Sequence, residues 1–193
     1  MKDDVFFDIP AQYEGIANAT RAIDFNMASD LYTGSLLKTL TASKPSGRFL
    51  ELGTGSGLAT SWILDGLDKN SKLVTIENNE LLQNIARRQL TDERIEYVLA
   101  DGYDWLSTYS GEQFDLVFAD AMPGKYDLFE ETIALVKKGG FYVIDDMLPQ
   151  PNWPEGHAAR VDQFIHRLEK REDVSLTKLN WSTGIIIVTK PGS

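Results

Sequence analysis

The 193-residue sequence contains no cysteine, which excludes disulfides, thiolate metal sites and cysteine nucleophiles. It is also poor in basic residues: 19 Lys and Arg stand against 29 Asp and Glu, for a formal net charge of −10. Affinity for nucleic-acid backbones depends on Lys and Arg displacing counterions, so this balance argues against a nucleic-acid partner. No apolar run approaches the roughly 20 residues of a membrane helix, and no signal-peptide pattern opens the chain. We therefore expect a cytoplasmic protein with no membrane partner.

The sequence does contain a regular alternation of apolar, strand-length runs with helix-like stretches. The expected strands are 49–52, 73–76, 95–99, 114–119 and 141–144. The expected helices between them are 58–67, 80–90, 103–109 and 128–137, the last ending at Gly139-Gly140. This alternation predicts an α/β, doubly wound, Rossmann-like sheet with right-handed crossovers.

The two ends of the chain depart from this alternation. Residues 11–42 have the pattern of two helices, and another helix is expected from about 158 to 170. Two closely spaced strands, 174–179 and 185–189, can only pair as an antiparallel hairpin. We expect one domain over residues 1–193, with 1–43 as an N-terminal helical cap and 48–193 as the α/β core.

The first expected strand leads directly into a glycine-rich turn over residues 53–57. Glycines permit the unusual φ values of a tight reversal and let the backbone approach a ligand with no Cβ in the way. The helix that follows presents free N–H groups to an anionic group. Glu77, at the end of the second strand, stands where an acid accepts hydrogen bonds from ribose hydroxyls. The pattern predicts a nucleotide-like ligand. The acid alone does not distinguish a methyl donor from a nicotinamide cofactor, because both carry a ribose.

With Glu51 two places before the first glycine, the string Glu-Leu-Gly-Thr-Gly-Ser-Gly resembles motif I of the class I S-adenosylmethionine-dependent methyltransferases. Five βα units closed by an antiparallel hairpin are likewise that family's architecture, which implies seven strands in the order 3-2-1-4-5-7-6 with the last antiparallel. The resemblance implies an adenine contact for Asp101, while a helix N-cap at this position stays open. The expected cofactor-binding residues are Glu51, Gly53, Thr54, Gly55, Ser56, Gly57, Glu77, Asn78, Asp101, Gly102 and Asp120.

Residues 114–121 and 139–146 resemble the catechol and caffeoyl-CoA O-methyltransferase family more narrowly. In that family, acids matching Asp120, Asp145 and Asp146 hold a divalent metal that chelates two vicinal substrate hydroxyls. The resemblance therefore implies a metal site at these three acids, where carboxylate oxygens suit Mg²⁺ or Ca²⁺. The alternative is a set of loop carboxylates that orient the cofactor or cap helices.

Two departures from this narrower family bear on the chemistry. The second acid of its metal-binding pair is normally Asn and is Asp146 here. The family's lysine, three places after the first acid, is replaced by Pro123, and Lys125 stands two places further on. The lysine assists deprotonation in the relatives, so its role does not carry over directly to this sequence.

The expected function is S-adenosylmethionine-dependent methylation of an oxygen atom on a small phenolic or catechol-like acceptor. The acceptor must lose its proton to a metal or a general base. The base candidates are Asp120, Asp145 and His157, of which the two acids are the expected catalytic residues. Two other classes stay open: a nicotinamide-dependent oxidoreductase, which the Gly-x-Gly-x-Gly spacing opposes, and a non-catalytic S-adenosylmethionine-binding protein. Related bacterial enzymes are often dimers, which leaves a homodimer open.

Overall fold

The computed structural model describes residues 8–151 and 153–192. In chain order its elements are α1 (Tyr13–Ala22), α2 (Leu31–Ala42), β1 (Arg48–Leu52), α3 (Leu58–Gly66), β2 (Lys72–Glu77), α4 (Glu80–Gln89), β3 (Ile95–Leu99), α5 (Gly102–Thr108), β4 (Phe114–Ala119), α6 (Phe129–Ala134), β5 (Val136–Ile144), α7 (His157–Glu169), β6 (Ser175–Leu179) and β7 (Ile185–Thr189). The alternation expected from the sequence is confirmed.

The strands form one seven-stranded sheet in the order β3-β2-β1-β4-β5-β7-β6. The first five strands run parallel, and β7 lies between β5 and β6 and is antiparallel to both. The predicted order and the predicted hairpin are therefore confirmed. A doubly wound sheet of this kind places its binding crevice at the carboxyl ends of the parallel strands.

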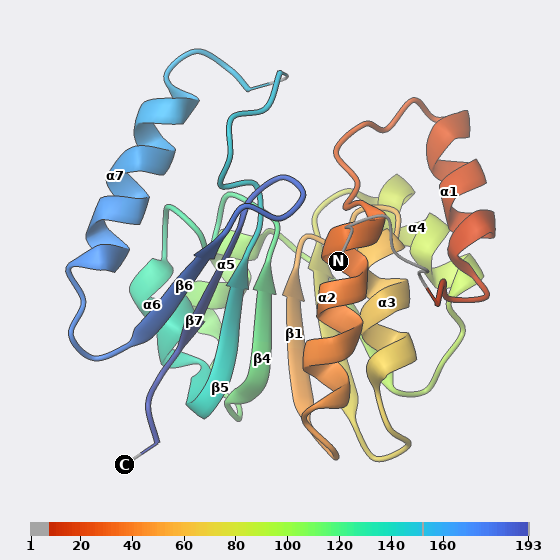
Figure 1. The fold of residues 1–193 in the computed structure, drawn as a ribbon. Helices are drawn as coiled ribbons and strands as arrows, with labels where there is room; N and C mark the ends of the chain where they lie inside the picture. The colour runs from red at the N-terminus through yellow and green to blue at the C-terminus, as the bar shows by residue number, and fades with distance from the viewer. Residues whose placement is uncertain (1–7, 152, 193) are drawn as a thin grey trace.

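Helices cover both faces of the sheet (Figure 1) and enclose a separate apolar core on each. The core under α5, α6 and α7 includes Leu50 and Leu52 of β1, together with Phe129 and Phe164. The core on the other face contains Phe49 of β1, packed with residues of α1, α2 and α3. Successive strand residues point to opposite faces, so strands that are apolar throughout require both layers of helices.

Two adjoining predicted boundaries are wrong: the end of the helix expected over 128–137 and the start of the strand expected over 141–144. The helix expected over 128–137 ends at Ala134, and Gly139-Gly140, predicted to end it, lie inside β5. Pairing with β4 determines this outcome: Val136 pairs with Phe114, and a register shift separates that pair from Leu116 and Phe141. Gly139 accommodates the irregularity with a φ of 72°. Sheet pairing overrides the local helix-ending signal here.

The N-terminal helices α1 and α2 pack into the core that α3 also covers, where Ile16, Ala17 and Leu37 are buried. Residues 1–7 of the cap expected over 1–43 lie outside the described residues, and the single domain over 1–193 stays a prediction. Among the described helices, none combines the length and apolar character needed to cross a membrane.

Three connecting segments gather beyond the carboxyl ends of the parallel strands, at the top of Figure 1. They are the loop between α1 and α2, the loop from β5 to α7, and the turn between β6 and β7. The candidate residues of β1, β2, β4 and β5 stand at this same end of the sheet, so the fold brings these segments over them.

Candidate functional site

The glycine-rich turn follows β1 directly and packs closely against Asp120 and Ala86. Gly53, Gly55 and Gly57 have φ values of 98°, 52° and 98°, which L side chains rarely adopt. A Cβ atom on Gly53 would lie 2.7 Å from the carbonyl oxygen of Asp120, and one on Gly57 would lie 2.8 Å from Cβ of Ala86. The helix that follows, α3, begins without a side-chain cap. Its first N–H groups therefore remain available to an anionic ligand.

The polar side chains of the turn region are used inside the protein. The hydroxyls of Thr54 and Thr75 lie 2.6 Å apart, and Thr20 donates to Ser56 Oγ at 2.7 Å. Glu51 is fully buried and accepts hydrogen bonds from Thr75 at 2.6 Å and Thr60 at 2.7 Å. Burial raises the pKa of Glu51 to about 8. What the turn presents at its surface is therefore backbone.

Glu77 connects the turn to the end of β2. Its Oε2 atom accepts a hydrogen bond from the Gly55 N–H at 2.8 Å. Its Oε1 atom accepts from the N–H groups of Asn78 and Asn79, at 3.0 and 2.9 Å. The carboxylate is thus held next to the turn at the predicted end of β2, and the exposed Asn78 adjoins it. Its contact with a ribose stays a prediction.

Asp101 and Gly102 stand at the end of β3, further along the same edge. Asp101 is the N-cap of α5 and accepts from the Tyr103 N–H at 2.7 Å, which is the capping alternative left open by the sequence. A Cβ atom on Gly102 would lie 2.7 Å from Cγ of Pro123. This close approach brings the end of β3 against the loop that follows β4.

Asp120 leads into that loop at the end of β4 and lies among polar partners from distant parts of the chain. Ser29, from the loop between α1 and α2, donates to Oδ2 of Asp120 at 3.1 Å. Nζ of Lys125 lies 3.4 Å from Oδ1 of Asp120 and 3.9 Å from Oδ2 of Asp146. Burial raises the pKa of Asp120 well above its usual range; Lys125 opposes this shift, while Asp145 and Asp146 add to it.

Lys125 itself is 4% exposed, so its charge is almost completely enclosed. Burial acts to lower the pKa of its ammonium, but the charges of Asp120, Asp146 and Asp145 outweigh burial and leave that pKa raised. Lys125 is therefore a cation at neutral pH.

Asp145 and Asp146 follow the end of β5, and their carboxyls play different parts. Asp145 is 2% exposed, and its Oδ1 atom accepts from Thr183 Oγ1 at 2.5 Å and from the Asp146 N–H at 2.7 Å. Burial raises the pKa of Asp145 to about 6. Asp146 has a left-handed φ of 59°, so the backbone has already left the sheet at this residue. Its side chain is 40% exposed.

The three acids do not fit the divalent-metal site that the sequence implied. Across residues 8–151 and 153–192, no group of three or more His, Cys, Asp or Glu side chains has an arrangement that could hold a metal ion. The Lys125 ammonium lies between Asp120 and Asp146, and Asp145 is turned toward Thr183.

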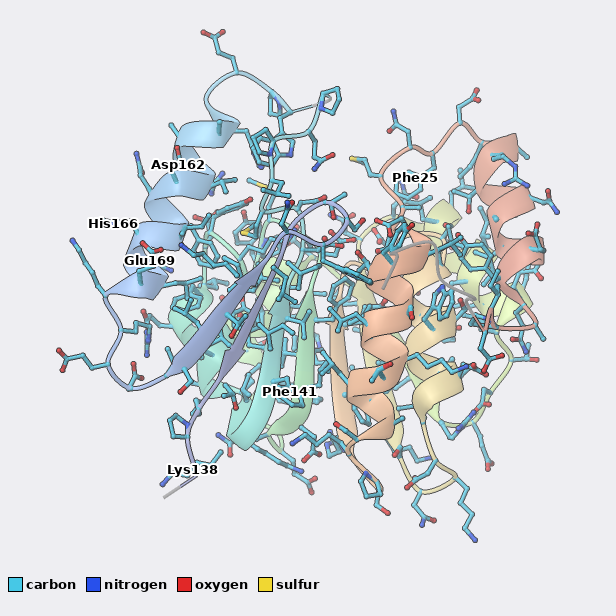
Figure 2. The ribbon with its side chains drawn as sticks, viewed as in Figure 1. Phe25, Lys138, Phe141, Asp162, His166 and Glu169 are labelled. Atoms are coloured by element: carbon cyan, nitrogen blue, oxygen red, sulfur yellow. The ribbon has the colours of Figure 1, made fainter. Side chains whose placement is uncertain are left out.

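Aromatic side chains stand beside this acidic cluster. The hydroxyl of Tyr126 lies 3.3 Å from Nε2 of His157, and the ring of Trp153 lies 4.6 Å from the His157 ring, centroid to centroid. Burial lowers the pKa of His157, and the charge of Lys125 lowers it further. On the other side, Phe25 approaches the glycine turn, with ring carbon Cε1 3.4 Å from an added Gly55 Cβ. Figure 2 shows Phe25 at this end of the molecule.

A family model described as "Methyltransferase domain" matches residues 50–147, just over half of the chain. The chain belongs to this methyltransferase-domain family. It is 30% identical over 146 residues to a catechol O-methyltransferase from Mycobacterium tuberculosis (strain ATCC 25618 / H37Rv), an alignment that covers 73% of this chain and 66% of that protein. The chain thus spans just under two thirds of the length of that curated relative.

Solved structures agree with this assignment. The O-methyltransferase TomG from Streptomyces achromogenes, solved in complex with SAM, superposes with a TM-score of 0.82 at 25% identity, over 97% of this chain and 93% of that one. An O-methyltransferase from Bacillus cereus in complex with SAH has the same fold, with a TM-score of 0.83 at 22% identity, over 97% of this chain and 94% of that one.

Three residues that adjoin the candidate site were missed from the sequence: Phe25, Ser29 and Thr183. Lys125 was noted from the sequence but not assigned to the site. The turn signal at Pro123-Gly124 could have indicated that Lys125 returns toward Asp120. Ser29 and Thr183 belong to no motif, because they reach the acids only through the assembly of distant segments.

Proposed function

We propose that this protein transfers a methyl group from S-adenosylmethionine to an oxygen atom of a small phenolic or catechol-like acceptor. The observation that carries the proposal is the position of the Asp120–Lys125 pair next to the glycine turn: the carbonyl of Asp120 closes the turn beneath Gly53. Family membership and the similarity to a catechol O-methyltransferase support the donor and the acceptor atom.

In this proposal the donor lies along the turn. Its methionine carboxylate faces the backbone of residues 53–57 and the uncapped start of α3. Its ribose hydroxyls donate to Glu77 beside Asn78, and its adenine lies toward Asp101 and Gly102. Glu51 and the hydroxyls of Thr54 and Ser56 support the turn from inside the protein.

The acceptor hydroxyl lies at Asp120 and Lys125. Asp120 accepts the acceptor's proton as the oxygen attacks the methyl carbon, and the C–S electron pair returns to sulfur, which leaves S-adenosylhomocysteine. Burial raises the pKa of Asp120, and a carboxylate of higher pKa is a stronger base for this step. The Lys125 ammonium stabilises the developing phenolate oxygen.

Asp145 is a positioning residue in this arrangement. Its carboxylate holds the Asp146 N–H and the Thr183 hydroxyl, which ties β5 to the hairpin turn. In-line methyl transfer depends mainly on holding nucleophile and methyl collinear and close. The acceptor is a small molecule, and a homodimer stays a prediction.

The first test is ligand binding, followed by turnover. S-adenosylhomocysteine should raise the melting temperature and NADH should not, because only a ligand of the native state stabilises it. A panel of phenols and catechols, incubated with S-adenosylmethionine and analysed by mass spectrometry, should then give O-methylated products. Protection by NADH alone would overturn the proposal, and donor binding without any methylated product would indicate a non-catalytic binder.

The Asp120→Asn variant separates catalysis from binding. It keeps the shape of the side chain but removes the base, so kcat should fall by at least about 100-fold while the Kd for S-adenosylhomocysteine changes little. Asp104→Asn, an exposed position on α5, is the matched control. Equal kcat values in Asp120→Asn and the control would remove Asp120 from the mechanism.

A further inference from the structure

The acidic cluster at the carboxyl ends of β4 and β5 already contains a cation. We propose that the Lys125 ammonium is the resident cation of Asp120 and Asp146, two of the acids that match the metal-binding acids of the catechol O-methyltransferase family, and that methyl transfer here does not require a metal ion. The catalytic part of this inference rests on the proposed function. The charge argument stands on the geometry of the side chains alone.

The ammonium is placed between the two carboxylates. Nζ lies 3.4 Å from Asp120 and 3.9 Å from Asp146, and the lysine side chain is only 5% exposed. A divalent ion bound by both carboxylates would have to share this space with a like charge. Removing the like charge would require Lys125 to leave its enclosed position, which breaks the ion pair with Asp120.

The third acid is already committed to other partners. Oδ1 of Asp145 accepts from both the Thr183 hydroxyl and the Asp146 N–H, and the residue is 2% exposed. A metal ligand set that included Asp145 would need this carboxylate to rotate away from the hairpin turn. A shared metal ion would need a space free of other positive charge and an Asp145 carboxylate free to turn toward it. The observed arrangement provides neither.

The loop after β4 explains how Lys125 reaches Asp120 from five residues away. Pro123 forms a bridge with Asp127, and the Gly124 N–H donates to the Asp127 carbonyl at 2.8 Å. Gly124 has a φ of 89°, and a Cβ atom there would lie 2.4 Å from Cδ1 of Leu52. This turn presses the backbone onto β1 and directs the next residue, Lys125, back toward the strand end. Despite the two-residue longer spacing, the turn therefore still brings a lysine to Asp120.

Mn²⁺ binding, measured by electron paramagnetic resonance without donor or acceptor, tests the charge argument directly. Specific binding is the part that Asp120→Asn removes. The wild-type protein should show none, whereas Lys125→Met should gain a specific site that binds Mn²⁺ at least about tenfold more tightly than any residual binding to the wild type, since a unit charge beside the ligands has been removed. Lys69→Met, at an exposed loop position, is the control and should behave as the wild type.

Specific Mn²⁺ binding to the wild-type protein overturns the proposal, and so does a folded Lys125→Met variant that gains no site. Circular dichroism establishes whether that variant is folded. If it is not, the wild type and Lys125→Arg decide together. Lys125→Arg keeps the charge and should bind no Mn²⁺, and specific binding to either protein overturns the proposal.

Turnover provides the second arm. Initial rates with the best acceptor of the panel should agree within about twofold with and without EDTA. Loss of activity in EDTA that Mg²⁺ restores would overturn the metal-free mechanism while leaving the O-methyltransferase proposal intact. Failure to find any methylated product would instead count against the proposed function, and the Mn²⁺ result would still decide the role of the ammonium.

Discussion

The Glu77 carboxylate accepts a hydrogen bond from the Gly55 N–H at 2.8 Å, across 22 positions of sequence. This bond joins the end of β2 to the middle of the glycine turn, so the acid that we assign to the ribose also shapes the backbone that we assign to the methionine carboxylate. Donor binding should therefore respond strongly to changes at either partner.

Glu77→Gln should weaken the binding of S-adenosylhomocysteine by at least about tenfold. The carboxylate accepts from three backbone N–H groups, and an amide group would present a donor to some of them. Isothermal titration calorimetry measures the change, with Glu80→Gln, an exposed neighbour on α4, as the control. Wild-type affinity in Glu77→Gln would contradict the ribose assignment.

Gly53→Ala should destabilise the protein by about 2–4 kcal/mol, because a left-handed φ and a backbone clash act together. The added Cβ would lie 2.7 Å from the Asp120 carbonyl oxygen. Gly139→Ala is the matched control: its φ is 72°, but no atom lies within 4 Å of the added Cβ. It should cost about 1 kcal/mol, measured for both variants by urea denaturation. Equal losses would mean that the close contact with Asp120 contributes nothing.

Glu51 should make the free energy of unfolding fall as pH rises. Its pKa is raised from 4.5 to about 8 in the folded protein, so between these values the native state binds its proton more tightly than the unfolded chain does. This stabilising contribution is present below about pH 4.5 and is lost as pH rises to about 8, by roughly 3–5 kcal/mol. Glu51→Gln should remove that slope from urea-unfolding measurements across the range. A slope identical to that of the wild type would show that Glu51 does not hold the proton.

Thr183→Val should destabilise the protein by about 1–3 kcal/mol. Valine keeps the shape of threonine but lacks the hydroxyl, so the buried Asp145 carboxylate loses a hydrogen-bond donor. The Thr183 hydroxyl lies 2.5 Å from Oδ1 of Asp145, which is 2% exposed. Thr177→Val, on the exposed face of β6, is the control for the change of side chain. If both variants unfold at the same urea concentration as the wild type, Thr183 does not anchor Asp145.

Much of the fold follows from local patterns that the sequence displays openly. The strands 95–99 and 114–119 were predicted to the residue, since each is a strand-length run of mostly apolar residues. Helix 128–137 was mispredicted at its end, because Gly139-Gly140 resemble a helix stop until β4 supplies the pairing partner that makes them part of a strand. The α7 helix shows the opposite case: its exposed residues Asp162, His166 and Glu169 (Figure 2) follow a plain helical spacing.

The sequence by itself determined the glycine turn, the acid at Glu77 and the alternation of strand and helix, because each depends on residues close together in the chain. The order of the strands came from the family resemblance. Only the tertiary structure decided what surrounds the acids. Spacing along the chain separates Lys125 from the position of the family's lysine, and no motif contains Ser29 or Thr183. The turn at Gly124, the loop before α2 and the hairpin turn bring these three side chains to Asp120 and Asp145. Such contacts form between segments as far as 91 residues apart, so they depend on packing rather than on local sequence.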